Sequence, residues 1–133
     1  MSIEEEILRD SKTVAIVGLS ANPERPSYTV GSYLKAHGYK VIPVNPMEKT
    51  ILDENSYADL RSIPERVDVV DIFRKSEDVL PIVRDAVAIG AKAVWMQEGV
   101  INEEAADYAR KAGLKVVMDK CMRRRHIRWQ GGE

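Results

Sequence analysis

The amino-acid sequence predicts an α/β protein with a single domain, residues 1–133, built on an open, doubly wound sheet of five parallel strands. Five apolar runs of strand length recur along the chain, and segments with apolar residues at helical spacing lie between most of them. Connections of that length suit parallel strands, which need a crossover rather than a tight turn. The chain is long enough to bury one core, and no internal repeat or linker divides it.

The first elements are expected to be a short helix, a strand and a long helix. Ser2 begins a sequence with the spacing of a capping box, which marks a helix start. Residues 14–17 are apolar throughout, as in a strand that is covered on both faces. A helical pattern resumes at Pro26 and ends at Gly38. Gly31 lies inside this helix at a cost of about 1 kcal/mol relative to alanine, so we expect the helix to pass close to the strand.

The remainder of the chain alternates between strands and helices. Strands are expected at residues 41–44, 67–73, 93–96 and 114–118, and helices over residues 76–89 and 103–112. Residues 51–59 are expected to be a connection, with Leu60 and Ile63 after it in the core. The tail, residues 123–133, is basic and then glycine-rich, and its histidine, His126, is expected in a solvated terminal helix.

Composition and charge narrow the classes of function. Lys and Arg number 20 and Asp and Glu number 21, so no basic surface for nucleic acid is indicated. The longest apolar runs have the length of strands, and the acidic N-terminus lacks the features of a signal peptide, so we expect neither a membrane span nor export. The single cysteine, Cys121, cannot form an internal disulfide, which favours a reducing, cytoplasmic location. We expect a cytoplasmic protein with a small-molecule ligand.

A phosphate-binding loop is expected between the first strand and the helix that begins near Pro26. The strand breaks at Gly18-Leu19-Ser20, and backbone N–H groups at a helix N-terminus favour an anion. The loop departs from the dinucleotide fingerprint, because Ser20 and Pro23 stand where G-x-G-x-x-G has glycines. The second strand ends at Asn45 rather than at the acidic residue of an NAD site. A phosphate-bearing ligand other than NAD is favoured, and a nicotinamide dinucleotide remains the alternative.

Ligands of doubly wound sheets bind outside the carboxyl ends of the strands, so the residues after each strand are the candidates. Arg25, just before the helix, is either a solvated loop residue or a fork-shaped partner for a phosphate. Lys49 is either a surface lysine or part of the same site. Phe73 and Arg74 are either a hydrophobic plug followed by a surface charge or a surface for an adenine or pantetheine group. Gly99 is either a turn residue or a point where backbone amides approach a ligand.

No catalytic constellation stands out in the sequence. It shows no carboxylate pair, no Ser-His-Asp set and no metal-ligand spacing. His37 lies near the end of a helix, where a charged imidazole suits the helix dipole, and it is expected to be structural. We therefore expect no catalytic residue and no metal site, in a chain that binds a ligand without turning it over by itself.

Cys121 follows the fifth strand, at the edge of the sheet where the ligand is expected. One interpretation is a small apolar residue packed in the interior. The other is a sulfur that faces the ligand, with Lys120 and Arg123 close in sequence, whose thiolate would attack a disulfide. The sequence leaves both interpretations open.

Five stretches of the sequence match a known family. They are VAIVGLSANPERPSYTVGSYL, GYKVIPVNP, VDVVDIFR, GAKAVWMQEGV and AGLKVVMDKCM, and they cover almost the whole chain in order. In these stretches the chain resembles the small, single-domain CoA-binding proteins, whose Rossmann-like fold is similar to that of the N-terminal CoA-binding domain of the succinyl-CoA synthetase alpha subunit. The resemblance implies coenzyme A as the ligand, bound at the strand ends.

Matched by position, the resemblance also implies which residues bind each part of the ligand. The pyrophosphate side would be Gly18, Ser20 and Arg25; the adenine and 3′-phosphate side Asn45, Pro46 and Lys49; and the pantetheine side Phe73, Arg74, Gln97, Gly99 and Val100. Leu19 and Cys121 complete the expected set of cofactor-binding residues.

Two departures from that family limit what it implies. The residue before His126 is Arg125, where similar proteins often have glutamate. The synthetase's second domain, with its phosphorylated histidine loop, has no counterpart in the sequence, so the chain is not expected to act as that ligase unaided. We expect it to bind CoA or a short acyl-CoA, with a homodimer or an acyl-CoA enzyme as candidate partner. The alternatives are a nicotinamide-dinucleotide redox sensor or enzyme, and a partner-dependent subunit of an acyl-CoA ligase.

Overall fold

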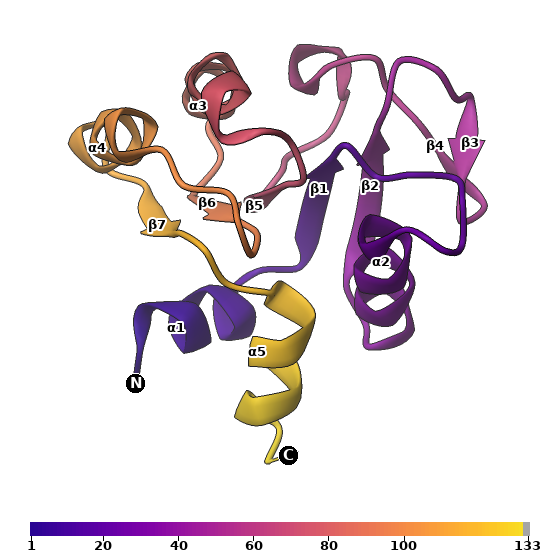
Figure 1. Cartoon of the computed structure of the whole chain (residues 1–133), viewed down its shortest axis with the longest axis horizontal. Coiled ribbons are helices and arrows are strands. Elements are labelled where there is room, and N and C mark those ends of the chain that lie inside the picture. The colour runs from indigo at the N-terminus through magenta and orange to yellow at the C-terminus, as the bar shows by residue number, and fades with distance from the viewer. Residues whose placement is uncertain (132–133) are drawn as a thin grey trace.

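The computed structural model describes residues 1–131, and its centre is a sheet of five parallel strands in the order β2-β1-β5-β6-β7 (Figure 1). The strands are β1 (Thr13–Val17), β2 (Lys40–Val44), β5 (Val69–Ile72), β6 (Ala93–Met96) and β7 (Lys115–Val117). Each lies parallel to its neighbours. The predicted fold class is confirmed, and each predicted strand ends within about two residues of its observed bounds. Gly132 and Glu133, the last residues of the predicted domain and tail, lie outside the described residues.

Helices cover both faces of the sheet, which makes it doubly wound (Figure 1). One face packs against α1 (Ile3–Asp10), α2 (Pro26–Ala36) and α5 (Met122–Trp129), and the other against α3 (Val79–Ala88) and α4 (Glu103–Lys111). Side chains of β1 alternate between the two faces. Val14 and Ile16 belong to the core on the α1, α2 and α5 side, and Ala15 and Val17 belong to the core on the α3 and α4 side. Two cores explain why residues 14–17 of β1 are all apolar. In the described part of the chain, no helix is long and apolar enough to span a membrane.

Two local predictions for the helices are confirmed. Ser2 Oγ accepts from the Glu5 N–H at 3.1 Å, and the Ser2 N–H donates to Glu5 Oε1 at 3.0 Å, which completes a capping box before α1. Gly31 packs so closely that a Cβ there would lie 3.4 Å from Ile16 Cδ1 of β1 and 3.1 Å from Leu19 Cδ1. Glycine therefore lets α2 approach the sheet.

The connection predicted at residues 51–59 contains a hairpin, which corrects that prediction. Strands β3 (Thr50–Ile51) and β4 (Glu54–Asn55) pair antiparallel. Their turn has positive φ at Leu52 (56°) and Asp53 (62°). It lacks the Asn-Gly or Asp-Gly pair that marks such turns in a sequence, so nothing local indicated a hairpin.

Short elements lead from this hairpin back to the main sheet. Tyr57 bridges Val44 in parallel at the outer edge of β2, and a 3-10 helix, η1 (Leu60–Ser62), follows. A second one, η2 (Ser76–Asp78), precedes α3. Leu60 is 2% exposed and Ile63 packs against the same core, as predicted.

The basic tail also departs from its predicted solvated state. Helix α5 packs against α1 and α2, with Met122 and His126 buried. Tyr33 of α2 holds His126 through a 2.7 Å hydrogen bond between its hydroxyl and Nδ1. Burial lowers the pKa of His126, and His37, which stacks on Tyr33 at the end of α2, acts in the same direction. Because the buried residues lie four apart and the arginines lie between them, α5 is amphipathic and packs rather than standing in solvent.

Asp71 of β5 is a buried acid within the sheet. Its side chain is 0% exposed, and neither carboxyl oxygen has a hydrogen-bond partner among residues 1–131. Burial raises the pKa of Asp71 well above its usual value of 3.8, and the Ile72 N–H, which lies outside hydrogen-bond geometry, is a smaller effect in the opposite direction. The folded protein therefore keeps this acid protonated over a pH range in which the unfolded chain ionises it.

Asp71→Asn is expected to stabilise the protein at neutral pH. Because the folded pKa of Asp71 is raised, the contribution of this residue to the free energy of unfolding is fully present below its unfolded pKa and is lost as pH rises through the folded pKa. The difference in free energy of unfolding between Asp71→Asn and wild type should open above about pH 3.8 and grow by up to about 1.4 kcal/mol per pH unit until the folded pKa is reached. Urea unfolding of both proteins at about pH 4, 5.5 and 7 measures this. Parallel stability curves for the two proteins would contradict it.

Candidate functional site

A large cavity lies at the carboxyl ends of β1 and β5, which are neighbours in the sheet. The chain leaves β1 into α2 on one face and leaves β5 into α3 on the other, so the two connections part at this point. Such a switch point is where doubly wound sheets bind ligands. The cavity has a volume of about 1040 Å³, which is enough for a nucleotide-sized ligand.

Gly18 ends β1 in a conformation that glycine adopts readily and other residues rarely do, with φ +89°. A Cβ at this position would overlap the Phe73 carbonyl oxygen and lie 3.2 Å from the Phe73 carbonyl carbon. The Gly18 N–H donates to Val44 O at 3.0 Å. The start of the loop is thus held between β5 and β2, and this brings its backbone to the edge of the cavity.

The loop closes onto the N-terminus of α2 through Ser27, which is 5% exposed. Ser27 Oγ accepts from the Ser20 N–H at 2.9 Å. Arg25 is the N-cap residue but its side chain makes no capping hydrogen bond, and Pro26, the next residue, has no N–H. The Ser27 N–H has no acceptor among the described residues. A helix N-terminus that is open to a cavity in this way is suited to bind an anion.

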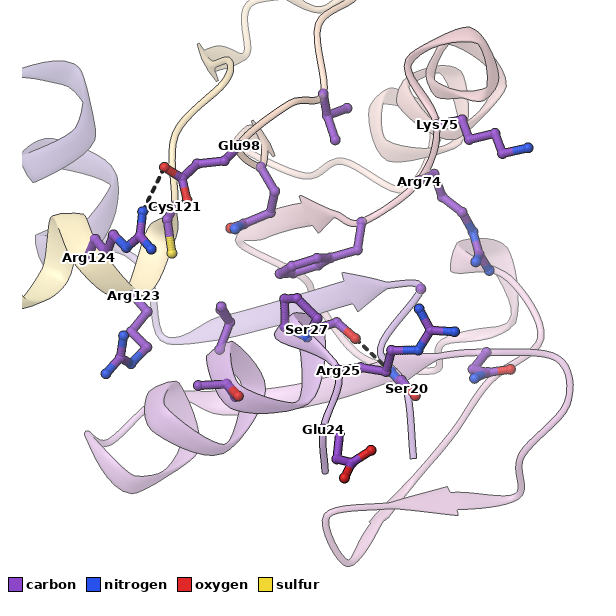
Figure 2. Close-up of a pocket in the computed structure, with 18 of the residues that line it drawn as sticks. Ser20, Glu24, Arg25, Ser27, Arg74, Lys75, Glu98, Cys121, Arg123 and Arg124 are labelled. Atoms are coloured by element: carbon purple, nitrogen blue, oxygen red, sulfur yellow. Dashed lines mark hydrogen bonds and ion pairs between the residues drawn. The ribbon is translucent and has the colours of Figure 1, made fainter. Parts of the chain in front are cut away.

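Basic side chains lie at both ends of the cavity (Figure 2). They are Arg25, Arg74 and Lys75 at one end, and Arg123 and Arg124 at the other. Acidic side chains also border it, at Glu24, Asp78 and Glu98. Glu98 is paired with Arg124 at 2.9 Å, whereas Arg25, Arg74 and Arg123 form no salt bridge within residues 1–131. The cavity is therefore positively charged on balance, as a phosphate-bearing ligand requires.

A less polar wall joins the two basic ends. Phe73 borders the cavity directly after β5, and Val100 borders it from the loop after β6. Gln97 is 5% exposed, and its Oε1 accepts from the Met122 N–H at 3.1 Å, which ties the loop after β6 to the start of α5. Cys121 is the half-buried N-cap residue of α5, and it both packs against the core and borders the cavity. The two interpretations of Cys121 are thus not exclusive.

Most of the residues predicted for the site border this one cavity. They are Gly18, Ser20, Arg25, Asn45, Phe73, Arg74, Gln97, Val100 and Cys121. They follow all five strands of the main sheet, because the carboxyl ends of parallel strands meet at one edge. That they bind a ligand there stays a prediction.

The other predicted residues do not border the cavity. Leu19 is 0% exposed in the core, and Pro46 borders a separate cavity of about 190 Å³. The Gly99 N–H donates to Asp119 Oδ1 at 2.7 Å, and Lys49 is exposed on the loop before β3. A residue that follows a strand in the sequence therefore need not direct its side chain or its backbone amide into the cavity.

The cavity has further walls that the sequence interpretation missed. They are Glu24, Pro26, Ser27, Thr29, Val30, Lys75, Asp78, Glu98, Arg123 and Arg124. Spacing could have identified Thr29 and Val30, because residues three and four positions after Pro26 share its face of α2. The arginines of α5 had no such signal, since only packing brings that helix to the cavity.

Comparisons with known proteins agree on one family. The sequence model of a family described as a CoA binding domain matches residues 12–126. The uncharacterized protein YneT of Bacillus subtilis is 36% identical over 122 residues, which cover 92% of this chain and 90% of that protein. A solved structure of a hypothetical protein from Pyrococcus horikoshii has a TM-score of 0.94 and 40% identity, and covers 98% of this chain and 94% of that one. The ADP-forming acetate–CoA ligase II of Archaeoglobus fulgidus is 29% identical over 105 residues, which cover 75% of this chain but only 16% of the ligase.

Proposed function

Because this chain belongs to the CoA-binding domain family, we propose that it binds coenzyme A or a short acyl-CoA in the cavity at the carboxyl ends of β1 and β5, and that it does not catalyse turnover by itself. The chain is related to a segment of ADP-forming acyl-CoA ligases, and that segment is a small part of those enzymes. Binding without turnover by this chain alone is consistent with that relationship.

The phosphate loop is the observation that carries the proposal. The Ser27 N–H is open at the N-terminus of α2, and Ser27 Oγ holds the Ser20 N–H in place. Arg25 borders the same end of the cavity and has no salt bridge within residues 1–131. Backbone donors, a helix dipole and an unpaired guanidinium together favour a pyrophosphate, which CoA carries.

The rest of the cavity suits the remainder of CoA. A pyrophosphate at Arg25 would leave the pantetheine arm to run along Phe73 and Val100 towards Cys121. These side chains offer apolar contact to the methyl and methylene groups of that arm. In this orientation the thiol of CoA lies at the α5 end of the cavity.

The arrangement at Asn45 favours CoA over a nicotinamide dinucleotide. Asn45 Nδ2 donates to Leu19 O at 3.0 Å, and its Oδ1 accepts from the Met47 N–H at 2.8 Å. Its side chain is thus used to shape the loops, and no acidic residue takes its place to accept the ribose hydroxyls of NAD. Calorimetric titration with CoA, acetyl-CoA, NAD and NADP tests the proposal. Clear binding of NAD with none of CoA would overturn it.

Arg25→Ala is expected to weaken CoA binding much more than Arg128→Ala. Arg25 borders the cavity beside the open N-terminus of α2, whereas Arg128 is exposed on α5 away from it. Loss of a charge-assisted hydrogen bond costs about 1.5–3 kcal/mol, so the Kd for CoA should rise by roughly 10- to 150-fold. Arg128→Ala should leave Kd within about two-fold, because Arg128 does not border the cavity and would make no contact with the ligand. Equal Kd values for wild type and both variants would remove Arg25 from the site.

A partner could still make the protein catalytic. Since the chain spans 16% of the related ligase, a separate acyl-CoA ligase subunit is the partner that this alternative requires. Co-purification with an ATP-binding ligase subunit, and acyl-CoA formation by the mixture but not by the chain alone, would support it. A cytoplasmic location and a homodimer remain proposals, the first supported by the single cysteine.

A further inference from the structure

The α5 end of the cavity has an uncompensated positive charge. Arg124 is neutralised by Glu98, with 2.9 Å between the paired atoms. Arg123 has no salt bridge within residues 1–131, and its Cζ lies 5.5 Å from the centroid of the Tyr33 ring. Contact with the ring restrains the Arg123 side chain while its N–H groups stay available to a ligand.

The start of α5 adds backbone donors at the same end. The eight-residue helix has Cys121 as its N-cap residue, and the Cys121 side chain accepts no capping hydrogen bond. Gln97 Oε1 accepts from the Met122 N–H, but the Arg123 and Arg124 N–H groups have no acceptor in the described part of the chain. These N–H groups and the helix dipole favour negative charge near Arg123.

Gln97 gives an independent indication that a ligand belongs here. The Met122 N–H can donate only to an oxygen, so the atom of the Gln97 amide that it contacts is Oε1. The other terminal atom of this amide is therefore the donor Nε2. Gln97 is 5% exposed, it borders the cavity, and its Nε2 donates to no protein atom among residues 1–131. Gln97 Nε2 is not among the buried atoms that lack a partner, so this donor is accessible at the cavity wall and available to a ligand acceptor.

We propose that the α5 end of the cavity binds a carboxylate at the far end of an acyl group, so that the preferred ligand is a CoA thioester of a dicarboxylic acid. This rests on the proposed function, which puts the phosphates of CoA at the opposite, Arg25 end (Figure 2). The acyl carboxylate meets Arg123 and the open N–H groups of α5, and Gln97 Nε2 donates to the thioester carbonyl oxygen. A neutral acyl group would leave the Arg123 guanidinium unpaired.

Succinyl-CoA and butyryl-CoA provide a matched test, because their acyl chains have the same number of carbons and only one ends in a carboxylate. Calorimetric titration of wild type should show succinyl-CoA bound about 10-fold or more tightly than butyryl-CoA. In Arg123→Gln the ratio of the two affinities should fall to about one. Arg128→Gln, an exposed arginine of the same helix, should keep the wild-type ratio. CoA and dephospho-CoA are titrated alongside.

Three results would overturn the inference. The first is an equal affinity of wild type for both thioesters, and the second is a ratio that Arg123→Gln leaves unchanged. The third is an equal loss of affinity in Arg123→Gln for CoA and both thioesters but not for dephospho-CoA, which would assign Arg123 to the 3′-phosphate instead. CoA binding without a preference for succinyl-CoA contradicts this inference alone, whereas absence of CoA binding contradicts the proposed function as well.

Discussion

Gly18→Ala is expected to destabilise the protein by about 3 kcal/mol or more and to abolish CoA binding. The φ of Gly18 is +89°, which strains any residue that has a Cβ. The Cβ would also overlap the Phe73 carbonyl oxygen, and this atom is part of the backbone and cannot rotate away. The end of β1 would have to move from β5, and the phosphate loop would move with it. Urea unfolding and calorimetric titration with CoA measure the two effects.

Gly38→Ala is the matched control for this substitution. Gly38 has φ +95°, close to that of Gly18, but a Cβ there would meet nothing within 4 Å. The backbone strain alone should cost about 1–2 kcal/mol and leave CoA affinity unchanged. The difference in free energy of unfolding between the two variants therefore measures the effect of the contact with Phe73. Equal losses of stability, with CoA binding retained in both, would show that the loop tolerates displacement from β5.

Cys121 is expected to form a mixed disulfide with CoA when the protein is incubated with CoA disulfide. The Cys121 thiolate attacks one sulfur of the CoA disulfide, a bond forms between Sγ and that sulfur, and the second CoA leaves as a thiolate. The exchange needs no further oxidant. Because the thiol borders the cavity at the end where the pantetheine arm would arrive, binding brings the two sulfurs together. Intact mass spectrometry should show one CoA adduct per chain, which reductant removes.

Controls separate a directed reaction from the general reactivity of a thiol. Cys121→Ser should give no adduct, since the chain has no other cysteine. Glutathione disulfide at the same concentration should react more slowly with wild type, because it lacks the nucleotide that the cavity would hold. Arg25→Ala should slow the reaction with CoA disulfide and not that with glutathione disulfide. If wild type stays unmodified while CoA still binds reversibly, Cys121 is a packing residue only.

The sequence alone predicted the elements whose causes are local. The runs at residues 14–17 and 93–96 are apolar because each strand is covered on both faces, and this pattern needs no tertiary knowledge. The position of Gly31 inside a helix indicated a close approach to the strand, and this is confirmed because a Cβ at Gly31 would lie close to Ile16 and Leu19. The rule that parallel strands present their carboxyl ends at one edge was enough to select a set of residues most of which border the cavity.

The hairpin at β3 and β4 was missed because its cause is not local. Leu52 and Asp53 take positive φ without any glycine, so no turn signal is present. The turn is held from outside, by a hydrogen bond from Lys35 Nζ of α2 to Leu52 O and by the ion pair of Lys35 with Glu54 at 3.1 Å. Contacts with α2, which precedes the hairpin in the sequence, thus stabilise a turn that residues 50–55 do not indicate by themselves.

The residues at the α5 end of the cavity were likewise brought there by tertiary packing. A helix with arginines at 123, 124 and 125 looks solvated in sequence, yet burial of Met122 and His126 against α1 and α2 fixes its position. The same packing places Arg123 at the cavity and orients Gln97 through the Met122 N–H. Periodicity reports which face of a segment is apolar, and so it determined the strands, the helices and the edge of the sheet that holds the site. Which distant surface an apolar face packs against depends on the whole chain, and only the tertiary structure decided which charges meet across the cavity.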